Sequence, residues 1–328
     1  MQNNQTLEGQ IIRIIKETDK YQKLEIVVNN KTIKIENGKN QETAFKPYKV
    51  NDKVILKQAQ TPQGKRFFIS DYVRRDSLLI LLVLFVFTVV LVARKKGLAS
   101  LLAMLISFTV IFGYILPNLA LGHDPISVAI AGSLVIVPVT FLLSHGVNHK
   151  TFVAIVATFV ALIITGVLAV LFVELTRLTG FSSDEASFLH LAEKGTLQMK
   201  GLLLAGIIIG VLGVLDDVTV SQSAIVFQLK KTNPNLGFGE LVKKTMDIGH
   251  DHISSMVNTL VLVYTGASLP LLLLFINNPQ PIAQVINYEL IAEEIVRTLV
   301  ASIGLVISVP ITTLLAAYVA TNSYLSGD

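Results

Sequence analysis

Neither cysteine nor tryptophan occurs among the 328 residues of the sequence. Without cysteine, no disulfide framework and no thiolate metal site can form, so redox chemistry does not indicate a compartment. Without tryptophan, an aromatic belt at a membrane interface must consist of tyrosine and phenylalanine. Charged residues are also scarce, at 15% of the chain against roughly 25% in soluble domains. Together with 52% hydrophobic residues and a mean hydropathy of +0.63, this scarcity indicates a membrane protein.

The charge that is present lies unevenly along the chain. Residues 1–75 hold 15 of the 27 Lys and Arg residues, while long later stretches hold none. We therefore expect two regions in different solvents, a soluble domain at 1–74 and a transmembrane domain at 75–328. The chain opens MQNNQTLEGQ, which lacks the basic and then apolar run of a signal peptide.

Short alternating runs predict that residues 1–74 form an all-β domain. Turn residues at Asn29-Asn30 and Asn37-Gly38 separate some of these runs, as in a small barrel or sandwich of the OB or SH3-like type. Acidic residues are interleaved with the basic ones, so a solvated surface is favoured over a site for an anionic partner. No dense set of aromatic residues accompanies the basic ones, so we expect no nucleic-acid partner. The five predicted strands lie in EGQIIRIIKE, QKLEIVVNN, KTIKIENG, DKVILKQ and RFFISDY.

The remainder of the chain predicts about seven transmembrane helices, with the lipid bilayer as their surroundings. Each apolar run is near or above the ~20 residues that span a hydrocarbon core of about 30 Å. The basic residues that flank the first and shortest run can extend it by snorkelling. The predicted spans lie near 77–93, 98–117, 125–143, 151–173, 201–228, 256–276 and 298–320.

The short loops predict an orientation. With seven spans, the basic loop residues fall on one side, whereas the loop at Gly122-His123-Asp124 on the other side has no Lys or Arg. The positive-inside rule therefore predicts a cytoplasmic C-terminus and an N-terminal domain outside. Without a visible signal sequence, translocation of that domain is unexplained. The basic residues are Arg94, Lys95, Lys96, Lys150, Lys230, Lys231, Lys243 and Lys244.

Two pairs of segments resemble each other and recur in the same order. Leu116-Pro117 matches Leu269-Pro270, and Val137-Pro138 matches Val309-Pro310 in the next span of each half. This order favours a 3+1+3 parallel internal repeat, an organisation in which transporters place a site between the halves. The alternative is that two common kink motifs of membrane helices align by chance.

Two adjacent carboxylates, Asp216 and Asp217, lie within the apolar stretch 201–228. Fifteen helical residues from Gly201 place Asp216 about 22 Å into the membrane, where a carboxylate is expected to be paired, protonated or hydrated. On a helix, Asp216 shares one face with Thr219 and Ser223, and Asp217 shares the next face with Ser221. Such oxygen ligands suit a hard cation or a proton. The alternative is that the span ends at Leu215 and Asp217 caps a second, interfacial helix.

A polar stripe enters the following span. Asp247, Asp251, Ser254 and Asn258 recur at helical spacing, and His250 lies beside them as a candidate proton carrier. We expect this stripe to face the bundle interior, close to the carboxylates of the preceding span.

Other polar residues favour structural roles. Gly206 and Gly210 form a small-xxx-small pair that is typical of helix packing. Glu289, Glu293 and Glu294 precede Arg297 in a pattern typical of a solvated helix. His145 and His149 are four residues apart, but no third ligand is visible nearby, so a surface pair is favoured over a metal site and no cofactor is expected.

Three blocks in the membrane region resemble the YibE/F-like family of bacterial multi-pass membrane proteins. They read GVLDDVTVSQSA, GHDHISSMVNTLVLVYTGASLPLLLL and EEIVRTLVASIGLVISVPITT. The resemblance implies a protein of the bacterial plasma membrane, and it does not imply an activity or a substrate.

The favoured hypothesis is a transporter or permease that handles a cation or proton with its membrane carboxylates and is not an enzyme. A second hypothesis is a non-transporting scaffold or sensor whose β domain binds an envelope partner. A third, an intramembrane aspartyl protease, requires two carboxylates on different spans to share a proton, and the Gly-x-Gly-Asp setting of such enzymes is missing. A homo-oligomer is compatible with each of these.

Overall fold

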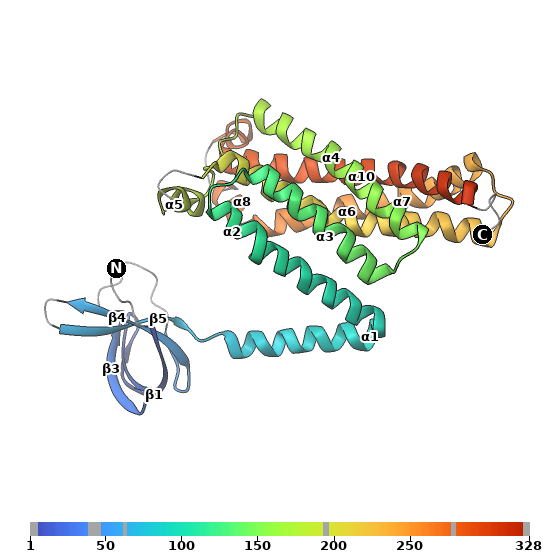
Figure 1. The fold of residues 1–328 in the computed structure, drawn as a ribbon. Coiled ribbons are helices and arrows are strands. Elements are labelled where there is room, and N and C mark those ends of the chain that lie inside the picture. The colour runs from blue at the N-terminus through green and yellow to red at the C-terminus, as the bar shows by residue number, and fades with distance from the viewer. Residues whose placement is uncertain (1–5, 39–46, 62–63, 193–196, 277–279, 324–328) are drawn as a thin grey trace. The chain divides into compact units, whose positions relative to one another are not determined.

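The computed structural model describes residues 6–38, 47–61, 64–192, 197–276 and 280–323. Its first part is a five-stranded antiparallel sheet in the order β3-β2-β1-β4-β5 (Figure 1). The five strands predicted from the sequence are thus confirmed. They are β1 (Thr6–Thr18), β2 (Tyr21–Val28), β3 (Lys31–Asn37), β4 (Lys53–Thr61) and β5 (Gly64–Tyr72).

Alternation of side chains explains the core of this sheet. Along β2 every second residue from Gln22 to Val28 is buried, as expected for a strand with one face toward a core. Asn29 and Asn30 between β2 and β3 have φ values of 45° and 63°, which a two-residue type I′ hairpin turn requires. The core consists of Ile11, Leu24, Ile26, Val28, Ile35, Tyr48, Val54 and Leu56.

The rest of the described chain is helical. Asp124 caps α3, and hydrogen bonds from the hydroxyl and backbone N–H of Ser127 hold the pKa of Asp124 below its usual value. The elements are α1 (Arg75–Val110), η1 (Ile111–Ile115), α2 (Leu116–Ala120), α3 (Pro125–His145), α4 (His149–Leu175), α5 (Asp184–Ala192), α6 (Met199–Thr232), α7 (Phe238–Ala267), α8 (Leu269–Ile276), α9 (Ile282–Val285) and α10 (Glu289–Ser323).

Within the described residues, five helical stretches are long and apolar enough to cross a membrane, where the sequence predicted about seven. The first two predicted spans fall within one stretch, Arg75–Ala120, which is interrupted at Arg94 (φ 53°, ψ −131°). The predicted span 256–276 is divided between α7, which has 30 residues, and α8, which has eight, and neither helix is among the five stretches. The other stretches are Pro125–His145, His149–Leu175, Met199–Thr232 and Glu289–Asn322.

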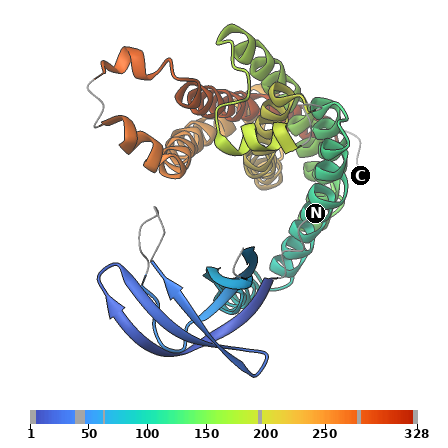
Figure 2. The same ribbon diagram turned by 90° about the vertical axis from the view of Figure 1, so that its left-hand side faces the viewer.

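The chain divides into two compact units at Val89/Val90, within α1. In the second unit α6 packs against α3, α4, α7 and α10, and α10 also packs against α4 and α7. Figure 2 views these helices close to end-on. The buried face of α6, from Leu203 to Leu215, forms much of the core of this unit.

The two halves of the predicted repeat have similar local structure. Leu116-Pro117 begins the short helix α2 after α1 and η1, and Leu269-Pro270 begins the short helix α8 after α7. Pro138 and Pro310 each lie inside the next long helix, α3 and α10. The repeat itself stays a prediction.

Candidate functional site

The buried face of α6 contains three neutral polar side chains that all have partners. The hydroxyls of Thr219 and Thr158 on α4 lie 2.7 Å apart in a hydrogen bond. Ser223 donates to the carbonyl of Lys150 at 2.8 Å, and Gln222 donates to the hydroxyl of Thr313 on α10 at 2.8 Å. Thr219, Gln222 and Ser223 are fully or almost fully buried. These bonds fix α6 to α4 and α10.

The bond between Ser223 and Lys150 shows where Asp216 lies along the bundle. Ser223 is level with Lys150, near the start of α4, and Asp216 lies seven residues, about 10 Å, farther along α6. Along the helix axis Asp216 therefore lies about 10 Å from the Lys150 end of α4.

Asp216 lies at the edge of the buried face. Its side chain is half-buried, and within the described chain its carboxylate accepts no hydrogen bond and forms no ion pair. α6 runs without interruption from Met199 to Thr232. The alternative in which Asp217 caps a separate, interfacial helix is therefore wrong.

The opposite face of α6 is open and consists of small or polar residues. Gly206, Gly210, Gly213, Asp217 and Ser221 recur at intervals of three or four residues, and all are exposed. Lipid-facing helix surfaces are normally covered by large apolar side chains, so this face is unusual for a membrane helix.

The polar stripe on α7 also lies on an exposed surface, which corrects our expectation that it faces the bundle interior. The side of α7 that packs against its neighbours contains Leu241, Thr245, Gly249 and Leu260. A helix with small and apolar residues on one face turns its polar residues to the other. The exposed stripe residues are Asp247, His250, Asp251, Ser254 and Asn258.

The structure does not bring the carboxylates of α6 and α7 into contact. Among the described residues, no hydrogen bond joins Asp216 or Asp217 to Asp247 or Asp251. In the same residues no group of three or more His, Asp or Glu side chains could hold a metal ion. Asp217 instead lies within electrostatic range of His145, the last residue of α3.

At the far end of α6, a cluster around Arg297 replaces the solvated helix that the sequence suggested. Glu293 is only 8% exposed and accepts hydrogen bonds from Arg297 at 2.6 Å and from Ser182. Glu289 accepts from the backbone N–H groups of Thr179 and Gly180. The loop before α5 is thereby held against the start of α10.

Two of the open-face glycines lie beneath polar groups of other helices. A Cβ atom at Gly206 would lie 3.9 Å from Nη1 of Arg297, and one at Gly210 would lie 3.5 Å from the hydroxyl of Tyr264. Since Asp217 and Ser221 follow on the same face, polar groups extend along most of α6.

Sequence reasoning missed Gln222, Thr158 and Thr313, which complete the buried network. Gln222 stands between Ser221 and Ser223 in a largely apolar helix and three residues after Thr219, so its position could have been noticed. Thr158 and Thr313 resemble other threonines in apolar runs, and their partners are distant in sequence.

Comparison with known proteins bears on the helical part of the chain. A family described as YibE/F-like protein matches residues 81–322, well over half of the chain. No curated protein and no solved structure matches the chain.

Proposed function

We propose that this chain, which belongs to the YibE/F-like family, is a membrane transporter that moves a cation, a proton or a small solute along the open face of α6. The observation that supports this most is Asp216, a carboxylate deep in an apolar helix without a partner among the described residues. An ionisable group at that depth is costly, and membrane proteins keep such groups chiefly where they serve transport or proton transfer.

The surrounding residues support a path rather than an isolated site. Asp217 and Ser221 supply oxygen ligands on the open face, and the exposed residues of α7 supply more. A polar face cannot be satisfied by lipid. A second copy of the chain would exclude lipid from it, and we expect the transporter to be a homo-oligomer.

Flux measurements in proteoliposomes test this function. Wild type and Asp216→Asn would be reconstituted at equal density and screened for proton, cation and metabolite flux. We expect flux with the wild type and none above empty liposomes with Asp216→Asn, while both insert equally. If no flux occurs with the wild type across the screen, transport is wrong. If Asp216→Asn fails to insert, the carboxylate is structural.

The proposed location is the bacterial cell membrane, with the Lys150 end of the bundle in the cytoplasm. Because the chain has no cysteine, single cysteines can report the topology. Val147, 90% exposed in the loop between α3 and α4, should resist an impermeant maleimide in intact cells, while a cysteine at His123 should react. The reverse pattern would invert the topology.

The scaffold or sensor hypothesis is supported by one observation, that the β domain has its own core within a separate compact unit. Crosslinking of this domain to a specific envelope partner, combined with no flux in liposomes, would favour it. A protease function lacks the shared proton that it requires, since no hydrogen bond among the described residues joins the α6 and α7 carboxylates.

A further inference from the structure

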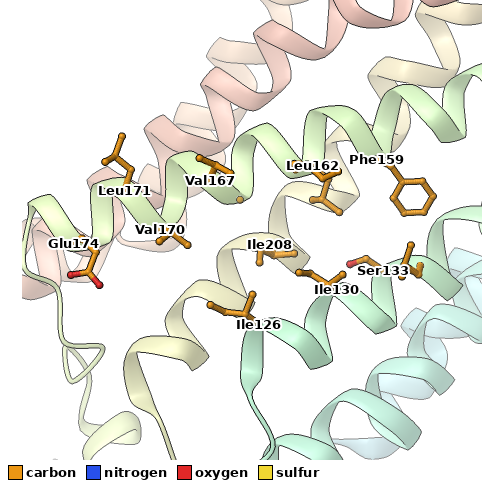
Figure 3. Close-up of a pocket in the computed structure, with 13 residues that line it drawn as sticks. Ile126, Ile130, Ser133, Phe159, Leu162, Val167, Val170, Leu171, Glu174 and Ile208 are labelled. Atoms are coloured by element: carbon orange, nitrogen blue, oxygen red, sulfur yellow. The ribbon is translucent and has the colours of Figure 1, made fainter.

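A long apolar groove lies between α3 and α4, away from the carboxylates. It has a volume of about 680 Å³, and Ile208 of α6 contributes to its lining. Along α4 it follows one helical face from Phe159 to Glu174, and along α3 it follows residues 126–134. Figure 3 shows Glu174 at one end, and Phe159 and Ser133 at the other.

The dimensions of the groove match an extended hydrocarbon chain. The fifteen residues from Phe159 to Glu174 correspond to about 22 Å of helix, more than half of a hydrocarbon core of about 30 Å. Gly166 in the middle leaves the groove wide, since a Cβ there would meet nothing within 4 Å.

The lining excludes a polar occupant along most of this length. Apart from Glu174, the polar side chain in the lining is Ser133, and its hydroxyl donates to the carbonyl of Ala129 at 2.8 Å. Ile163 and Val167 in the same lining are 66% and 63% exposed. In a bilayer this side of α4 would face lipid, so an acyl chain could enter sideways.

The charged end of the groove carries both signs. Glu174, in the last turn of α4, pairs with Lys200 of α6 through Oε1 at 2.5 Å, and 64% of the Glu174 side chain is exposed. A headgroup with a primary ammonium and a phosphate complements this pair, because the ammonium can donate to the carboxylate and the phosphate can accept from the lysine.

We propose that this groove binds one acyl chain of a phospholipid with a primary-ammonium headgroup, as in phosphatidylethanolamine, with the ammonium at Glu174 and the phosphate at Lys200. The site is independent of the proposed transport path. It would fix the separation of α3 and α4 at the Glu174 end.

The absence of tryptophan allows a direct test. In full-length Phe159→Trp, the introduced indole is the only one and lies at the apolar end of the groove. Vesicles would contain acyl-brominated phosphatidylethanolamine or phosphatidylcholine, whose trimethylated ammonium cannot donate. We expect the brominated acyl chains to quench the fluorescence of the indole. The ethanolamine lipid should bind about two- to fivefold more strongly than the choline lipid, which is the scale of an exposed ion pair. Glu174→Gln should remove the preference.

Two further variants serve as controls. Phe87→Trp, on a helix surface where the phenylalanine is 60% exposed, should be quenched equally by both lipids. Gly166→Leu should fill the groove and reduce quenching at position 159 but not at position 87. If Phe159→Trp does not fold, Leu134→Trp, also in the lining, replaces it.

Three results would overturn the proposal. Equal quenching of the Phe159→Trp indole by both lipids would mean that the groove takes up bulk lipid and does not distinguish between headgroups. Absence of quenching would mean that acyl chains do not enter. Quenching unchanged by Gly166→Leu would mean that the lipid lies elsewhere.

Discussion

The two faces of α6 differ in how they treat polar groups. On the buried face, Thr219, Gln222 and Ser223 are neutral, and each has a hydrogen-bond partner on another helix or segment. On the open face and at its edge, Asp217 and Asp216 can carry charge, and neither has a partner among the described residues.

This difference suggests two roles for polar residues within one helix: the neutral side chains hold the helices together, and the carboxylates are available for the proposed function. A neutral side chain can be satisfied by one or two hydrogen bonds and then stabilises helix packing. A carboxylate in hydrocarbon needs a counter-charge, a proton or water. The buried network therefore positions α6, and in the proposed function the unpaired carboxylates would bind the transported ion or solute.

Added bulk should produce the largest contrast. A Cβ at Gly249 of α7 would lie 2.8 Å from Val309 and 2.9 Å from the Gln222 amide, whereas one at Gly213 would meet nothing within 4 Å. We expect Gly249→Leu to cost about 1–3 kcal/mol through overpacking, and Gly213→Leu to leave stability almost unchanged. Thermal unfolding in detergent measures the stability of both variants. Equal losses of stability would mean that the buried and open faces of α6 respond alike to added bulk.

The hydrogen bond between Thr158 and Thr219 should give the next effect. Thr219→Val leaves the Thr158 hydroxyl buried without its partner and should cost about 1–2 kcal/mol. Because the double valine variant removes both polar groups, its loss should be smaller than the sum of the two single losses. Strict additivity of the unfolding free energies would contradict the bond.

The sequence predicted much of this arrangement, but not its orientation. Strand alternation and the Asn29-Asn30 turn were sufficient for the β domain, because both act locally. The positions of Asp216 and Asp217 follow from the hydropathy of one stretch. Which way α7 faces could not be read from its own residues, because the packing of Gly249 against Val309 joins residues far apart in the sequence. Glu293 was misjudged because its partner Ser182 lies in a distant loop.

Serine substitutions should give the smallest effects and refine the contrast. Ser223→Ala removes the donor to the Lys150 carbonyl and should cost about 1 kcal/mol. Ser221→Ala, on the exposed face, should change stability by less than about 0.5 kcal/mol. Chemical unfolding of the two matched variants measures the difference, and a larger loss for Ser221→Ala would reverse the assignment of the faces.

The most direct test of the central claim compares Asp216→Asn with Thr219→Val in the same flux assay, normalised to inserted protein. The two residues are less than one turn apart on α6, and only one is a carboxylate. We predict that Asp216→Asn abolishes flux while retaining wild-type thermal stability, and that Thr219→Val lowers stability while retaining flux. Wild-type flux through Asp216→Asn would contradict the claim that the unpaired carboxylate carries the function.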